Sequence, residues 1–269
     1  MKKSQIHMTG TAYGSILALY IGCEWYGHAA DVLRELETQG FNLDIASHGL
    51  LIRTFAKVDD KMKPLLQAVE ASKFAVCKVL AKLSLEESPD HSHLSPILYE
   101  KVVGFLDGLK DEDEARTTLI QLYNAFLDYF WQRGLTGTSK MLLEKARKVY
   151  ALNTRPRKHS KEWTLDVRGL SVGGAIVAVI DWLLDAEDNV AVSINSSDLG
   201  DLNMVLITGG TEEPQFSTSL KGFLLGFLKK HESPFIESSE NPKKIQAAAA
   251  DVVKWVSQGT FKEKLGFIV

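Results

Sequence analysis

Apolar residues follow two different patterns along this chain, one in its first 150 residues and another after about residue 163. In the first part they recur three and four positions apart, as at Ala29, Val32 and Leu33, which is the period of an amphipathic helix. Gly40 supplies a helix stop at the end of the first predicted helix pair. In the second part, short apolar runs that end in Gly-rich turns alternate with longer helical faces. The pattern predicts a helical half followed by an α/β half.

The helical half repeats itself at a period near 35 residues. Tyr13 and His48, which are 35 positions apart, each precede a glycine at the start of a predicted helix, and a later unit starts at Tyr123. Helix pairs that recur at this period are typical of an α-solenoid, in which each pair buries its apolar face against its neighbours. The period is lost near Pro89 and Pro96, where the sequence resembles loops. An ordinary helical bundle therefore stays the alternative for this half.

The α/β half opens with the run Leu165-Asp166-Val167-Arg168-Gly169, a predicted strand that ends in a polar turn. A helix follows to about residue 184, and a second strand at about 204–208 ends at Gly209 and Gly210. Parallel strands joined by a helix end at the same edge of a sheet, so Asp166 and Arg168 should converge with Thr208 and the two glycines. The remaining elements are predicted as a helix at about 217–230, a third short strand at 235–237 and a last helix at about 245–256.

This sheet edge carries the candidate chemistry, and each of its residues has two interpretations. Asp166 could hold a hydrated divalent metal ion or act as a general base. The other interpretation is that it only caps the strand end. Arg168 could bind a phosphate group or the negative charge of a transition state. The other interpretation is that it only forms an ion pair with Asp166. Gly209 and Gly210 let a ligand approach the backbone closely, or they only form a tight turn. A carboxylate, a guanidinium and uncovered backbone N–H groups together favour a phosphate backbone as the ligand.

Positive charge is concentrated between the two halves. From Lys140 to Lys161 there are eight Lys and Arg residues against one acid, Glu144. One interpretation is a solvated helix face followed by a linker, and the other is a strip that contacts nucleic-acid phosphates beside the Asp166 edge. The residues expected in that strip are Lys145, Arg147, Lys148, Arg155, Arg157 and Lys158.

Composition narrows the classes of function. With 45% apolar residues, 24% charged residues and a net charge of -3, the chain resembles a soluble globular protein rather than a uniformly basic nucleic-acid coat. Cys23 and Cys77 share no motif, which indicates a reducing compartment. No apolar run reaches about 18 residues, so no membrane span is predicted. The histidines lack zinc-site spacing, so no metal site is predicted and no cofactor is certain.

With both halves placed, the chain resembles plant organellar pentatricopeptide repeat proteins that carry a carboxyl-terminal small MutS-related domain. The resemblance implies degenerate helical repeats over 1–155, a basic linker over 156–162 and a small MutS-related domain over 163–269, which is a two-layer α/β sandwich. The segments that carry it are Tyr123-Asn124-Ala125-Phe126-Leu127-Asp128 with Trp131, Leu165-Asp166-Val167-Arg168-Gly169-Leu170-Ser171-Val172-Gly173, Ser233-Pro234-Phe235 and Val252-Val253-Lys254-Trp255-Val256.

The resemblance also implies location and activity. Its members act mainly in chloroplasts, their repeats bind RNA, and for some of them the terminal domain cleaves RNA with a metal ion. Two positions in each repeat contact a base, and Asn124 is the first of them in the last repeat, whereas Gly14 has no side chain to do so. This chain departs from the family motifs in three places: Arg168 stands where many members have histidine, Glu212 and Glu213 replace a basic stretch, and Asn241-Pro242-Lys243 stands for an Asn-x-Gly.

Two functions follow from these observations. The favoured one is a structural and interaction subunit of a plastid transcription or RNA-processing assembly, with protein subunits as partners and weak binding of RNA or DNA. The alternative is a metal-assisted RNA endonuclease in which Asp166 and Arg168 are catalytic and Mg²⁺ is the cofactor.

Overall fold

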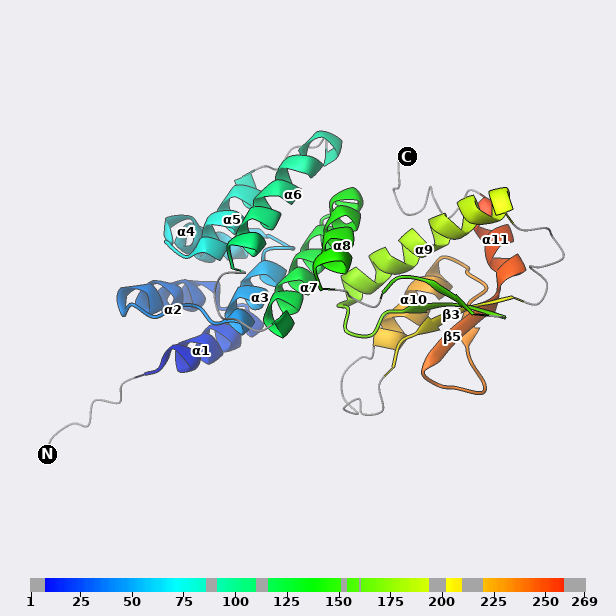
Figure 1. Ribbon diagram of the computed structural model, residues 1–269. Helices are drawn as coiled ribbons and strands as arrows, with labels where there is room; N and C mark the ends of the chain where they lie inside the picture. The colour runs from blue at the N-terminus through cyan, green and yellow to red at the C-terminus, as the bar shows by residue number, and fades with distance from the viewer. Residues whose placement is uncertain are drawn as a thin grey trace, which may run out of the picture. The chain divides into compact units, whose positions relative to one another are not determined.

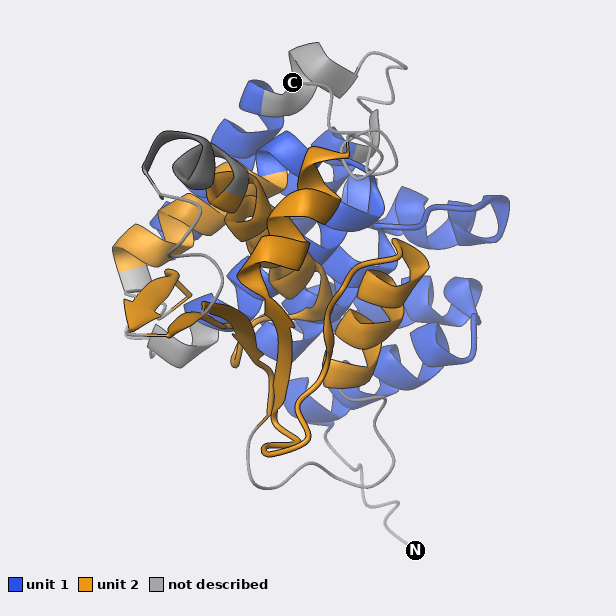
Figure 2. Ribbon diagram, turned by 90° about the vertical axis from the view of Figure 1, so that its right-hand side faces the viewer, with its two compact units in different colours: residues 1–138 blue, residues 139–269 orange. Residues whose placement is uncertain are grey.

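The computed structural model describes residues 8–85, 91–109, 116–150, 154–159, 161–193, 202–209 and 220–258. The chain forms two compact units, Met1–Thr138 and Ser139–Val269, which Figure 2 colours separately. This division falls before the boundary that the sequence placed at residue 155. All of helix α8 (Thr136–Tyr150) except its first three residues therefore belongs to the second unit.

The first unit is helical throughout the residues that the structure describes. Neighbours in the stack are α1 with α2 and α3, α2 with α4, and α3 with α5 and α7 (Figure 1). The contacts of α1 with α3, α2 with α4 and α3 with α5 join alternate helices, as stacked helix pairs do, so this unit is consistent with a helical repeat. The contact of α3 with α7 departs from that pattern, because it skips three helices. Its elements are α1 (Gly10–Gly22), α2 (Tyr26–Thr38), α3 (Ile45–Thr54), the 3-10 helix η1 (Asp60–Met62), α4 (Lys63–Ala71), α5 (Ala75–Leu85), α6 (His91–Gly108) and α7 (Arg116–Gln132).

Local signals explain where several of these helices begin and end. The Thr9 hydroxyl accepts a hydrogen bond from the Ala12 N–H at the start of α1, at 3.3 Å. Gly40, with φ of 75°, follows the end of α2 in a conformation that favours glycine. Pro96 lies inside α6 rather than in the loop that the sequence suggested. The helix continues past it because the following turns bury Leu98, Val102 and Leu106, whereas a proline costs one backbone hydrogen bond.

The second unit combines α8 with a five-stranded sheet of order β1-β2-β3-β5-β4. β2 and β3 are parallel and are joined through α9, which is the predicted strand–helix–strand unit, and the other neighbours are antiparallel. Its elements are β1 (Arg157–His159), β2 (Glu162–Asp166), α9 (Val172–Ser193), β3 (Asn203–Ile207), α10 (Leu220–Lys230), β4 (Ile236–Glu237), β5 (Lys244–Ala248) and α11 (Ala249–Ser257). The expected linker at 156–162 thus contains strand β1.

The last predicted helix divides into a strand and a helix. Residues 244–248 form β5 and pair with both β3 and β4, and only from Ala249 does the chain become helical. Ile245 and Ala247 are buried alternately along β5. Their spacing also fits a helix, and alanine has no strand preference, so sheet pairing rather than local propensity decides the structure here.

Helix α9 is the centre of the second unit. It contacts α10 and α11, and the Trp182 ring lies 5.8 Å from Trp163 on β2 and 6.4 Å from Phe235. Every residue from Ala175 to Leu183 is buried, as expected for a helix that is apolar on most of its circumference. Within the described residues, no helix is both long and apolar enough to span a bilayer.

Candidate nucleic-acid interface

The predicted convergence at one sheet edge follows from strand register. Asp166 pairs with Ile207 across the parallel strands, and the Val167 N–H donates to the Ile207 carbonyl at 3.1 Å. The Thr208 N–H donates to the carbonyl of Lys243, the residue before β5, at 3.0 Å. Arg168, Thr208 and Lys243 therefore follow or precede three adjacent strands at the same edge of the sheet.

Asp166 and Arg168 form a bidentate ion pair. Arg168 Nε donates to Oδ1 at 2.9 Å, Nη2 to Oδ2 at 2.6 Å, and the Arg168 backbone N–H to Oδ1 at 3.1 Å. Gly169, with φ of 81°, is a central residue of the tight turn that follows β2, in which the Leu170 N–H donates to the Val167 carbonyl at 3.2 Å. Of the two interpretations of Arg168, the ion pair is the one that this geometry realises.

The ion pair determines the protonation state of the carboxylate. Burial alone would raise the pKa of Asp166, but hydrogen bonds from the Arg168 side chain and backbone, with the charges of Arg168 and Arg157, lower that pKa overall. The side chain of Asp166 is 19% exposed and that of Arg168 is 54% exposed. Asp166 is thus ionised, and Arg168 compensates its charge. The carboxylate in turn holds the Arg168 guanidinium at a position that is partly exposed to solvent. Within the described residues, no three His, Cys, Asp or Glu side chains cluster as a metal site would require.

Gly209 accommodates a lysine side chain. A Cβ atom at position 209 would lie 3.2 Å from Lys243 Cγ and 3.3 Å from Lys243 Cβ. The close approach that glycine allows is therefore made by the first carbons of the Lys243 side chain. The Asn241 side chain holds the Lys243 backbone, because its Oδ1 accepts a hydrogen bond from the Lys243 N–H at 3.0 Å. Lys243 was not predicted as part of the site, although its signal was the lysine in Asn241-Pro242-Lys243 where glycine was expected. Gly210, Glu212 and Glu213 lie outside the described residues.

The segment that contains β1 adds two arginines to this edge, Arg157 on the strand and Arg155 before it. Arg157 pairs with Thr164 and shares a sheet face with it and with Asp166, because side chains two apart on a strand point the same way. Arg155 lies two residues before β1, beyond the ladder that pairs β1 with β2. Both arginines are exposed. Lys158 is exposed as well but pairs with Trp163, so it belongs to the opposite face.

We call these four basic residues the cationic edge: Arg155, Arg157, Arg168 and Lys243. Its members come from three separate parts of the second unit: the segment with β1, the turn after β2 and the residue before β5. Asp166 and Arg168 compensate each other's charge, so the net positive charge of the edge comes from Arg155, Arg157 and Lys243. Guanidinium and ammonium groups gathered in this way suit phosphate oxygens.

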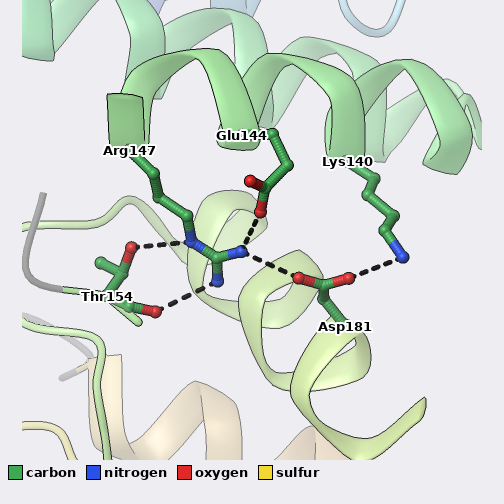
Figure 3. A network of polar contacts seen from close by, with 5 residues as sticks. All are labelled: Lys140, Glu144, Arg147, Thr154 and Asp181. Atoms are coloured by element: carbon green, nitrogen blue, oxygen red, sulfur yellow. Dashed lines mark hydrogen bonds and ion pairs between the residues drawn. The ribbon is translucent and has the colours of Figure 1, made fainter. Parts of the chain in front are cut away.

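Arg147 differs from the expected phosphate-contacting strip. It is 6% exposed, and its Nη1 donates to Asp181 Oδ2 at 2.8 Å and to Glu144, while its other nitrogens bind Thr154 (Figure 3). Lys140 Nζ lies 2.8 Å from the other Asp181 oxygen, Oδ1. The cause is helical geometry, since Arg147 shares a face of α8 with buried Leu143.

The other candidates lie apart from this cluster. Lys148 on α8 is exposed and Lys145 is partly exposed. Asn124 lies on α7 in the first unit and is also partly exposed. Asp44 is the N-cap of α3, where its Oδ1 accepts a hydrogen bond from the Ser47 N–H at 2.8 Å. A Cβ at Gly14 would lie 2.8 Å from Ser47 Oγ and 3.1 Å from Asp44 Oδ2, which explains the glycine there.

Comparison with known proteins adds a relative for the whole chain. No protein-family model matches the sequence. A chloroplastic pentatricopeptide repeat-containing protein of Arabidopsis thaliana is 26% identical over 259 residues, which covers 94% of this chain and therefore residues of both units. The chain spans only 17% of that relative's length. The similarity supports the resemblance to pentatricopeptide repeat proteins, and the relative's compartment agrees with the expected chloroplast.

Proposed function

We propose that this chain is an RNA-associated protein of the chloroplast that acts mainly as an interaction subunit of a plastid transcription or RNA-processing assembly. In this proposal the second unit, as a small MutS-related domain, contributes weak and sequence-independent contacts to RNA phosphates through the cationic edge. The similarity to a chloroplastic pentatricopeptide repeat-containing protein supports the compartment and the class of ligand. The repeat-like first unit supports a role in interactions, because stacked helix pairs present extended surfaces.

The observation that carries the RNA contact is the gathering of Arg155, Arg157, Arg168 and Lys243 from separate segments. A chain with a net charge of -3 has no general attraction for polyanions, so local positive charge must supply it. The described edge offers no set of donors arranged to read a base. Phosphate contacts position a nucleic acid without selecting its sequence, which is why the binding should be non-specific.

The endonuclease alternative would require Asp166 to exchange its arginine for a metal ion or a reacting proton. Three hydrogen bonds from Arg168 now hold that carboxylate. The lowered pKa of Asp166 also makes it a weak base near neutral pH. The edge geometry therefore favours binding over cleavage.

The test measures how the affinity for a labelled single-stranded oligoribonucleotide depends on salt concentration. Replacing all four cationic-edge residues with glutamine should weaken binding and lower the slope of log affinity against log salt by roughly 0.7 for each phosphate that the protein no longer neutralises. A matched control replaces four exposed lysines elsewhere and changes the net charge equally: Lys57, Lys63, Lys229 and Lys230. The control should keep the wild-type slope.

Three outcomes would contradict the proposal. Equal slopes for the two variants would remove the cationic edge as the RNA-binding surface. No binding by the wild type at low salt would leave only the interaction role. Cleavage of the RNA in Mg²⁺ that is abolished in Asp166→Ala would replace binding with the endonuclease.

A further inference from the structure

Arg147 is the centre of a neutral cluster inside the second unit. It bonds Asp181 and Glu144, and Lys140 bonds the second oxygen of Asp181, so two cations face two anions (Figure 3). The side chains of Arg147 and Asp181 are 4% and 7% exposed. Buried and fully paired, Arg147 cannot attract a phosphate by itself.

The same guanidinium also holds the backbone of a neighbouring segment. Arg147 Nε donates to Thr154 Oγ1 and Nη2 donates to the Thr154 carbonyl, both at 3.1 Å. Thr154 is 1% exposed, whereas Arg155, the next residue, is exposed. Thr154 is therefore the fixed point from which the chain leaves the interior.

A second fixed point lies three residues later. The Thr164 hydroxyl donates to the Arg157 carbonyl at 3.2 Å, and Arg157 pairs with Thr164 in the β1–β2 ladder. Between these two points the chain contains Arg155 and Pro156, and the proline ring fixes one of the remaining backbone angles. The segment that carries two of the four edge cations is thus held at both ends.

We propose that Arg147 is a positioning residue for RNA binding, which holds Thr154 from inside the unit and so presents Arg155 and Arg157 to phosphates. This inference rests on the proposed function of the cationic edge. Arg147 contributes through geometry, not through its charge. Two arginines held in place lose less conformational freedom on binding than two on a loose segment.

Charge-conserving substitutions separate this role from direct phosphate binding. Thr154→Val removes the Oγ1 acceptor and changes no charge. Arg147→Lys keeps the charge beside Asp181 but lacks the planar fork that reaches Thr154 at two points. Each should weaken RNA binding several-fold and lower the salt slope, by roughly 0.7 for each phosphate that is no longer neutralised. Thr154→Ser restores the hydroxyl and should restore the wild-type slope, and Thr54→Val on α3, the same change in the first unit, should leave it unaltered.

The decisive comparison repeats Thr154→Val in a chain that already carries Arg155→Gln and Arg157→Gln. There the threonine substitution should no longer change the slope, because the groups that it positions are absent. A slope unchanged by both Thr154→Val and Arg147→Lys, while Arg155→Gln with Arg157→Gln lowers it, would overturn the positioning role and leave the cationic edge intact. If the two arginine substitutions leave the slope unchanged, the cationic edge fails and the inference fails with it. Should Thr154→Val not fold, as circular dichroism would show, Arg147→Lys decides alone.

Discussion

At the scale of single residues, two arginines in the second unit have opposite environments. Arg168 is half-exposed and is held over Asp166, while Arg147 is buried and neutralised on both sides. Arg147 lies in the basic stretch from Lys140 to Lys161 and Arg168 lies seven residues after it, but sequence position alone does not show which of the two is buried. Their partners do, since Asp166 is two residues from Arg168 whereas Asp181 is thirty-four residues from Arg147.

The buried pair predicts a large effect on stability. Asp181→Asn keeps the side-chain shape but leaves the Arg147 guanidinium without its main counter-charge, and removing one partner of a buried pair costs about 3–5 kcal/mol. The free energy of unfolding from urea titration should fall by that amount. Asp31→Asn is the matched control, because its pair with Arg34 is exposed on both sides (76% and 53%) and should contribute less than about 1 kcal/mol. Similar losses for both variants would contradict the account.

At the scale of elements, the sequence predicted the larger features and missed those that depend on pairing. The parallel strands β2 and β3 were predicted, because short apolar runs ending in polar turns mark both of them. The strand β5 was not predicted, because Ile245 and Ala247 fit a helix as well as a strand. Strand β1 has only exposed residues and no apolar signal, so only its ladder with β2 defines it.

Helix α8 shows the same limit at the boundary between the units. Its repeat-like sequence assigned it to the helical half, but its buried contacts to Asp181 and Thr154 are made within the second unit. The contact with Asp181 depends on a residue thirty-four positions further along the chain. The candidate site was predicted only in part. The spacing of the two strands predicted the Asp166 edge, but Lys243 was missed because the β3–β5 pairing brings it to that edge.

This assignment of α8 predicts which fragments fold. A fragment of residues 139–269 retains the Lys140, Arg147 and Asp181 cluster and should unfold cooperatively on heating. A fragment of residues 163–269 lacks α8 and β1, leaves Asp181 without either cation, and should melt at a clearly lower temperature or without cooperativity. Thermal denaturation followed by circular dichroism compares the two. Equal melting temperatures would show that α8 is dispensable.

At the scale of the whole molecule, the two units make separate contributions. The helical unit supplies a repeat-like surface, and the second unit supplies a local cationic edge in a chain that is negative overall. The weak RNA binding that we propose would depend strongly on salt, and it would gain in strength if the chain were held beside other RNA-binding surfaces.

Hydrogen–deuterium exchange of the whole chain, with and without a single-stranded oligoribonucleotide at low salt, tests this account most directly. Bound phosphates should slow amide exchange in the segments that form the cationic edge, at residues 154–157, 168–169, 208–209 and 241–243. The helices of the first unit should change less, because the phosphates are bound by the second unit. Slower exchange confined to the first unit, with none at those four segments, would contradict the central claim that the cationic edge contacts RNA.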